Sequence, residues 1–394
     1  MADGKTIIRQ NLDGIRDELT RLSHAIHGRP ELGFEEFYAR DIQVELLRKH
    51  GFSVEVPYGG LETAFRASIK TGDGPRVAFL SEYDALPGYG HACGHNIIAA
   101  SALGAGIGLA GAMKDQDVPG EVIVMGTPGE EGRHGKVYLV EHGAFDSVDF
   151  ALMMHPSSKN LIGRGGLAVQ IVIARYTGKA AHSASPEKGI NALTSLVNLF
   201  VAVDQLRQVW PDTGRCTGII TEGGKAPNII PDLAEGKFCV RASKMKEVKA
   251  MVAGIRKAAE SAAAVTGAKL EFTEEMLIAE RYSNLAMGEL FKANMESMGE
   301  TMQYPDPLAR YGSSDIGNVS MVVPAVHEYL AIVDPSVAGH THEFREASCS
   351  SRADEVVLLG AKGLAMTGWD LMTDEAKRNA VRREFEEKVL PFQC

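Results

Sequence analysis

The sequence has little cysteine and little clustered positive charge. Five cysteines are spread over 394 residues without a C-x-x-C pair, at Cys93, Cys216, Cys239, Cys349 and Cys394. This spacing fits neither a disulfide framework nor a structural zinc knuckle, and it leaves only Cys93 with a reactive setting. The net charge of −10 comes without the basic clusters that bind nucleic acid or an anionic membrane. A small solute is the ligand class that we expect.

The sequence also lacks a long unbroken apolar run and a leader-like start. Its apolar stretches are interrupted by glycine or polar residues short of a membrane span, and residues 1–14 lack the basic-then-apolar pattern of a signal peptide. We therefore predict a cytoplasmic protein with no membrane partner. What the sequence does have is a globular composition, 45% hydrophobic and 23% charged, over a length that allows two domains.

The first part of the chain has the pattern of a parallel α/β domain. Residues 12–52 predict two amphipathic helices broken at Pro30, with Gly51 as the stop. Apolar runs that start at Arg76, Glu121 and Phe150 have strand character, and helical patterns separate them. This alternation predicts a β-α-β-α-β order and a largely parallel sheet.

The pattern changes from about residue 165. Residues 167–275 alternate as strand, helix, two strands, helix and strand, which is the βαββαβ order of a ferredoxin-like unit. The remainder returns to mixed helices and short strands. We predict a discontinuous catalytic domain of residues 1–163 and 276–394, into which residues 164–275 are inserted as a lid or dimerisation domain.

Polar side chains follow the predicted parallel strands where each strand ends. These residues are Glu82, Asp84, Glu130, Glu131 and His155. Because ligands bind beyond the carboxyl ends of the strands in such sheets, we expect these groups to lie together. Nearby, the two-residue spacing places Cys93 and His95 on one side of an extended segment, and Asn96 could cap the helix that follows.

Thiolate and imidazole together suit Zn²⁺ or a similar metal. By itself the C-x-H spacing equally fits a packed thiol beside a satisfied histidine, and Glu130–Glu131 equally fits a solvated acidic turn. A cation would offset the repulsion between the adjacent carboxylates, so that one could bind metal while the other acts as general base. His340 or His342 could complete the ligand set, with His342 the weaker candidate, and His91 has no clear partner.

Seven segments, in order, resemble one known family. They are HAIHGRPELGFEE, EYDALPGYGHACGHN, GTPGEEG, MMHP, GKAAHSASPEKGINAL, GGKAPNIIPDLAEGKFCVRA and GSSDIGNVSMVVP. This set resembles the two-metal amidohydrolases and metallopeptidases that include aminoacylases, carboxypeptidase G and auxin-conjugate hydrolases. It is most similar to the branch of aminobenzoyl-glutamate hydrolase and β-alanyl-lysine dipeptidase.

The resemblance implies a site and a reaction. The metal ligands would be Cys93, His95, Glu131, His155 and His340, holding two divalent ions per chain, Zn²⁺ or Mn²⁺. Glu130 would be the general base of amide hydrolysis, and Asp84 would orient a ligand, whereas Glu82 would not bind metal. In the inserted domain the resemblance implies His182 at the oxyanion, Asn228 at the substrate, Lys179 and Arg241 at its free carboxylate, and a homodimer.

Arg133 and His134 depart from the glycines that are common in this family after the paired glutamates. They would line the substrate pocket, and they motivate an alternative: hydrolytic deamination of an aromatic amine at the same two-metal site. A second alternative is a non-catalytic, metal-stabilised binding protein. It is disfavoured because Glu130 is present and because structural sites fill all positions of one metal. The exact acyl group and amino acid are open at this point.

Overall fold

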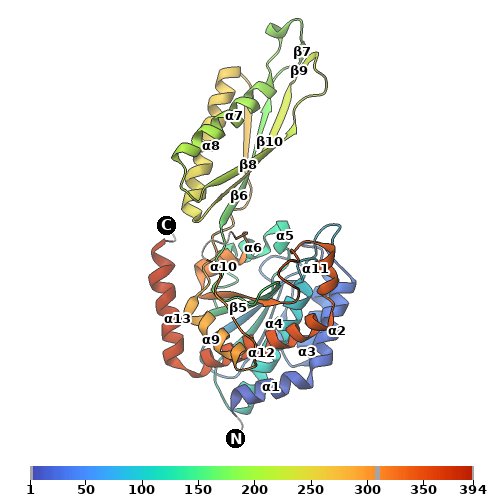
Figure 1. The fold of residues 1–394 in the computed structure, drawn as a ribbon, viewed down its shortest axis with the longest axis vertical. Coiled ribbons are helices and arrows are strands. Elements are labelled where there is room, and N and C mark those ends of the chain that lie inside the picture. Colours follow the sequence, from blue (N-terminus) through green and yellow to red (C-terminus); the bar gives the residue numbers. More distant parts are fainter. Residues whose placement is uncertain (1–2, 307–310, 393–394) are drawn as a thin grey trace. The chain divides into compact units, whose positions relative to one another are not determined.

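A computed structural model describes residues 3–306 and 311–392 of the chain. The chain forms two compact units (Figure 1). Unit 1 consists of Met1–Gly165, Tyr282–Arg310 and Ser314–Cys394, and unit 2 of Gly166–Arg281 and Tyr311–Ser313. Each unit has its own hydrophobic core, so each is described by itself.

Unit 1 is built on a six-stranded mixed sheet with the order β1-β2-β4-β3-β5-β12. The neighbours β4/β3, β3/β5 and β5/β12 are parallel, while β1/β2 and β2/β4 are antiparallel. The expected largely parallel α/β sheet is confirmed. The strands are β1 (Ser53–Glu55), β2 (Phe65–Lys70), β3 (Arg76–Ser81), β4 (Glu121–Gly126), β5 (Phe150–Ser157) and β12 (Ala325–Ala331).

Helices cover both faces of this sheet, because alternate residues of each strand enter different cores. On β3, Val77 and Phe79 belong to one cluster, and Ala78 and Leu80 to another. The first cluster includes α4, which packs against α1, α2 and α12, and the second includes α10, which packs against α6. The strands of unit 1 are therefore apolar on both faces.

The helices of unit 1 have the following bounds: α1 (Gly4–Gly14), α2 (Arg16–Gly28), α3 (Phe37–Lys49), α4 (His95–Asp115), α5 (Glu130–Arg133), α6 (Gly135–Glu141), α9 (Leu285–Glu296), α10 (Ile316–Val322), α11 (His342–Ala347), α12 (Ser351–Thr373), α13 (Glu375–Lys388) and the 3₁₀ turn η3 (Leu390–Phe392). α4 is long and apolar enough to cross a membrane by composition alone. In unit 1 it is a core helix, because 89% of its most apolar window is buried.

Two local expectations for unit 1 are wrong. Residues 12–52 do not form two helices: α1 ends at Gly14 and α2 starts at Arg16, so a further break precedes the expected one at Pro30. Asn96 does not cap α4, because the helix begins at His95 and its N-cap is Gly94 in the left-handed conformation. The Asn96 amide instead donates to Ser23 Oγ at 2.8 Å and to the Ser348 carbonyl at 2.9 Å.

Unit 2 has the expected βαββαβ order in a four-stranded sheet with the order β11-β6-β10-β8. A pair of two-residue strands, β7 and β9, extends the connections. Its elements are β6 (Ala168–Thr177), β7 (Ala181–His182), η1 (Pro186–Lys188), α7 (Ala192–Leu206), η2 (Arg207–Val209), β8 (Arg215–Glu222), β9 (Ile229–Ile230), β10 (Leu233–Ala242), α8 (Met245–Thr266) and β11 (Lys269–Glu274). α7 and α8 pack together and against the sheet.

The cysteines in the described part of the chain are all free thiols: Cys93, Cys216, Cys239 and Cys349. Cys394 lies outside the described residues. No disulfide therefore joins elements within the described ranges.

Candidate metal centre

The loop after β3 carries the first part of the site. Asp84 is buried, and its Oδ1 lies 2.9 Å from His95 Nδ1, while its Oδ2 accepts the Glu131 N–H at 2.8 Å. Burial alone would raise the pKa of Asp84, but His95 outweighs burial and lowers it. Asp84 thus fixes a histidine on one segment and the backbone of a glutamate on another.

The predicted metal-binding residues come together in unit 1. Ligand atoms lie within 4.8 Å of one another in three groups: Cys93 with His95 and His155, Cys93 with Glu131 and His340, and His95 with Glu130 and Glu131. Cys93 belongs to two of these groups. The five predicted ligands and Glu130 therefore form one continuous cluster, with the thiol between two sets of donors.

Backbone contacts explain how distant segments meet here. His155 is near the end of β5, where its Nε2 lies 3.4 Å from Cys93 Sγ and its Nδ1 lies 2.6 Å from the Pro156 carbonyl. The His340 N–H donates to the Ala92 carbonyl at 3.0 Å, although His340 is almost 250 residues from Cys93 in sequence. His340 adopts a left-handed φ of 63° in this turn.

The donors fit divalent metal ions. His95 Nε2 and Glu131 Oε1 are buried without a hydrogen bond, and their closest ionic neighbours are at 3.4 Å, Glu82 for the former and His340 for the latter. Because Asp84 faces Nδ1 of His95, the Nε2 lone pair is directed at the cluster. Imidazole, thiolate and carboxylate are ligands of Zn²⁺ and of related transition metals.

Burial makes the charged forms of these groups expensive in the absence of a cation. It raises the pKa of the Cys93 thiol to about 12. It also raises the pKa of Glu130 well above its ordinary value, and the carboxylates of Glu82, Asp315 and Glu131 raise it further. A bound cation would reverse this balance, since it favours the thiolate and the carboxylates.

A buried lysine that the sequence analysis did not single out lies beside this cluster. Lys136 Nζ is 2.5 Å from Glu82 Oε1 and 2.7 Å from Asp315 Oδ1, and all three side chains are almost fully buried. Burial alone would lower the pKa of Lys136, but the carboxylates of Asp315 and Glu82 outweigh burial and raise it. The ammonium group therefore stays charged and neutralises part of the carboxylate cluster.

The pocket at the cluster has a volume of about 240 Å³. Its lining includes Cys93, His155 and His340, and it also includes Arg164, whose guanidinium lies over the Tyr329 ring at 4.7 Å. Sequence reasoning missed Arg164, because a single arginine in a glycine-rich segment has no distinguishing pattern.

The other predicted residues of unit 1 are spread around this cluster. Arg133 is exposed at the end of α5, and His134 follows it with a left-handed φ of 59°. His91 is buried but belongs to none of the three groups of potential ligands. His342 is exposed and stacks on Tyr89 at 5.1 Å between ring centroids.

Within unit 2, the structure brings two of the four predicted residues together. His182 is on β7, which pairs with β9, and the Ser183 N–H donates to the Asn228 carbonyl at 3.0 Å. Lys179 and Arg241 are far apart: β6 and β10 pair from Thr177 opposite Leu233 to Val169 opposite Arg241. Eight residues of strand span about 26 Å. One carboxylate cannot contact both side chains within one chain.

Comparison with known proteins identifies the family. The peptidase dimerisation domain family matches residues 163–266. The chain is 38% identical to the Xaa-Arg dipeptidase of Mus musculus, over 96% of this chain and 91% of that protein. It is 32% identical to a p-aminobenzoyl-glutamate hydrolase polypeptide of Escherichia coli (strain K12), over 66% of this chain and 58% of that protein.

Solved structures agree on the fold. A dinuclear metal-binding peptidase of the M20 family from Bacillus subtilis has a TM-score of 0.70 at 19% identity, covering 92% of this chain and 99% of that one. The chain belongs to the M20 family of metallopeptidases and is a hydrolase of amide or peptide bonds. The resemblance seen in the sequence motifs is thereby confirmed.

Proposed function

We propose that the protein is a metal-dependent dipeptidase or N-acyl amino acid hydrolase. The observation that carries this proposal is the arrangement of Cys93 between two sets of donors, with Glu130 beside them. The 38% identity to an Xaa-Arg dipeptidase supports a dipeptide substrate, and the 32% identity to an aminobenzoyl-glutamate hydrolase supports a substrate with a free carboxylate.

Two divalent ions would be held by the side chains of Cys93, His95, Glu131, His155 and His340. Such ions polarise a scissile carbonyl and lower the pKa of water, to about 7 in well-studied zinc sites. Zn²⁺ and Mn²⁺ both suit this mixture of nitrogen, oxygen and sulfur donors. Asp84 keeps the His95 ring in the orientation and tautomer that binding requires.

Glu130 would act as the general base, and then as the acid. Its carboxyl group accepts the proton of the attacking water and delivers it to the leaving amine. Its surroundings suit this role, because burial and the carboxylates of Glu82, Asp315 and Glu131 raise its pKa above the ordinary value. A carboxyl with a raised pKa holds a proton more readily at neutral pH.

Unit 2 would contribute groups for the substrate. His182 would donate to the developing oxyanion and Asn228 would contact the substrate beside it, a pairing supported by the hydrogen bond between their segments. The free carboxylate would be bound by Arg241 or Lys179 but not by both within one chain. Arg133 and His134, next to Glu131 in sequence, would shape the pocket near the leaving group.

A homodimer through unit 2 is part of the proposal. β8 is an edge strand of the four-stranded sheet, and Ile219 and Ile220 on it are exposed. Val197 and Val201 on α7 are exposed as well. An open strand edge with exposed apolar side chains is a surface that a second copy can cover, and the matched family is named for dimerisation.

The test is product identification by mass spectrometry. The purified protein, with Zn²⁺ or Mn²⁺ added, is incubated with Xaa-Arg and β-alanyl dipeptides, N-acyl amino acids, aminobenzoyl-glutamate and amino-substituted benzoates. We expect a free amino acid as product, and none from Glu130→Ala; Glu141→Ala, at an exposed glutamate, is the matched control. Ammonia without amide cleavage would establish the deaminase instead. Binding without turnover of any substrate would favour the non-catalytic alternative.

A further inference from the structure

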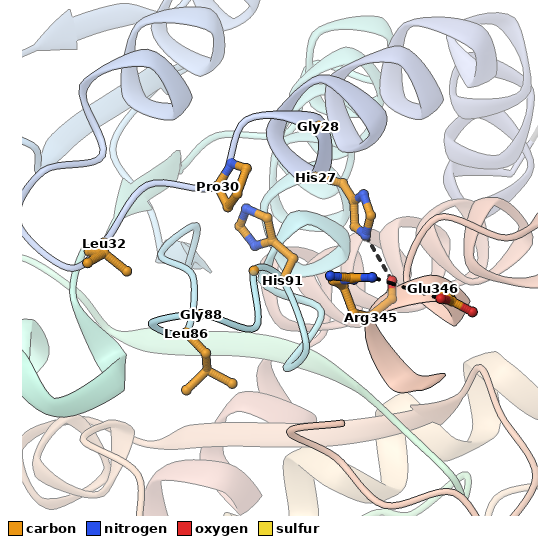
Figure 2. A pocket seen from close by; sticks show the side chains of 10 residues that line it. His27, Gly28, Pro30, Leu32, Leu86, Gly88, His91, Arg345 and Glu346 are labelled. Carbon is orange, nitrogen blue, oxygen red and sulfur yellow. Dashed lines mark hydrogen bonds and ion pairs between the residues drawn. The ribbon is translucent and has the colours of Figure 1, made fainter. Parts of the chain in front are cut away.

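A second pocket in unit 1 lies against the segment that leads to Cys93. It has a volume of about 590 Å³ and shares no lining residue with the pocket at Cys93 and His155. Three parts of the chain line it: the end of α2 with the segment that follows, the turn from Leu86 to His91, and α11. Pockets of 300 to 1,000 Å³ are typical for small ligands. Figure 2 shows the side chains around this pocket.

His91 lines this pocket and has an unmet need for a hydrogen bond. The side chain is only 1% exposed, and neither ring nitrogen has a hydrogen-bond partner among the described residues. The Ile26 carbonyl faces the ring without reaching hydrogen-bond geometry. The neutral imidazole has one donor and one acceptor, and leaving them unpaired costs about 1–3 kcal/mol. A polar ligand atom in the pocket would supply the missing partner.

Arg345 provides a positive charge at the same pocket. Its closest carboxylate, on Glu346, is 3.8 Å away and largely exposed, and within the described ranges the guanidinium makes no hydrogen bond. Its backbone is held in place, because His27 Nε2 lies 2.8 Å from the Arg345 carbonyl (Figure 2). A guanidinium with unused N–H groups matches the two oxygens of a carboxylate.

The rest of the lining is apolar and compact. Pro30, Leu32 and Leu86 contribute aliphatic surface. The turn from Leu86 to Gly90 is closed by two reciprocal backbone hydrogen bonds of 3.0 Å, so this wall has a defined shape. An occupant would therefore combine one anionic group with a small aliphatic body.

We propose that this pocket binds a small aliphatic carboxylate, with its carboxylate on Arg345 and a polar atom of the ligand on His91. The chemistry of the ligand rests on the proposed function, because both products of amide hydrolysis, the free amino acid and the acyl acid, fit this description. The bound molecule contacts the turn that leads to Cys93 within three residues, so the site is placed to sense product.

The experiment is isothermal titration calorimetry on the full-length protein with three probes of equal size. L-Leucine has a carboxylate and an ammonium group, 4-methylpentanoate has the carboxylate alone, and L-leucinamide has the ammonium alone. Binding of the first two supports a site for either product, and binding of leucine alone supports a site for the amino acid. Leucinamide binding as tightly as leucine would overturn the proposal.

Two variants locate the binding. Arg345→Gln removes the charge, and Gly28→Leu fills space, since a Cβ at Gly28 meets no atom within 4 Å. Each should raise the Kd at least tenfold, whereas Arg16→Gln, at an exposed arginine of the same helix as Gly28, should leave it unchanged. A Kd that neither variant alters would place the carboxylate elsewhere and overturn the proposal.

These measurements do not depend on turnover, so the two proposals can fail separately. Carboxylate binding that needs Arg345, in a protein that cleaves no amide, supports the pocket and contradicts the hydrolase. Amide cleavage in a protein whose carboxylate binding ignores Arg345 does the opposite.

Discussion

The buried carboxylate of Asp84 lies 2.9 Å from His95 Nδ1, on the opposite side of the imidazole from the cluster of potential metal ligands. Asp84→Asn removes the negative charge that orients His95 and also disturbs the bond to the Glu131 N–H. Loss of such a supporting carboxylate lowers metal affinity by about 10–100-fold. Competition with a chromophoric chelator measures this affinity.

Asp115→Asn, at an exposed aspartate at the end of α4, is the control and should keep wild-type metal affinity. If Asp84→Asn bound metal as tightly as the wild type, Asp84 would have no role in orienting His95.

The ion cluster of Lys136, Glu82 and Asp315 should make a large contribution to the integrity of unit 1. Lys136→Met leaves two buried carboxylates without their cation, and breaking a buried pair in this way costs about 3–5 kcal/mol. Urea unfolding followed by circular dichroism measures the loss. The triple variant Lys136→Met, Glu82→Gln, Asp315→Asn should recover part of it, because no charge is left unpaired. Equal stability of Lys136→Met and Lys114→Met, an exposed site, would contradict this.

Glu36 gives a pH dependence with a definite sign. Burial, and next the charge of Asp84, raise the pKa of this carboxyl to about 8 from an ordinary value of 4.5. Between these two values the unfolded chain has released the proton and the folded chain still holds it. The free energy of unfolding therefore falls as pH rises from about 4.5 to 8, by up to about 1.4 kcal/mol per unit from this one group.

Glu36→Gln should remove that slope, so the difference in unfolding free energy between variant and wild type should increase with pH over this range. Denaturant titrations at several pH values test it, with the exposed Glu45→Gln as control. A pH-independent difference for Glu36→Gln would show that Glu36 ionises normally in the folded protein.

The surface of unit 2 predicts how the dimer can be broken. Ile219 on the edge strand β8 is 63% exposed and Val201 on α7 is 54% exposed. A lysine at either position would place a charge in an apolar interface, where leaving it unpaired is costly. Ile219→Lys with Val201→Lys should shift the protein from dimer to monomer in sedimentation velocity. Lysine at the exposed Val265, at the end of α8, is the control; a dimer that tolerates both changes would place the interface elsewhere.

Local sequence patterns were enough to predict the parallel strands β3, β4 and β5 and the βαββαβ order of unit 2, because buried strands are short apolar runs between glycine-rich turns. The sharp break at Ile15 was missed, since neither proline nor glycine-proline chemistry marks it strongly. Ligand residues at strand ends followed from the topology, so their clustering could be anticipated.

Contacts between distant segments could not be anticipated in the same way. Lys136 occupies the start of a short amphipathic helix, where a lysine ordinarily faces solvent, and its burial depends on Asp315, 179 residues later. Arg345 meets His27 across 318 residues. Neither relationship leaves a periodic trace in the sequence.

The helix α4 begins at His95 and continues as the most enclosed helix of unit 1. Three of its glycines face neighbours so closely that an added methyl group would meet side-chain atoms at less than 3 Å: Gly104, Gly106 and Gly108. Chemistry and architecture are thus inherited together on one element. Anyone who transplants this site to another scaffold must transplant the helix with its partners, and variation that loosens the centre of the domain will also displace its most buried imidazole.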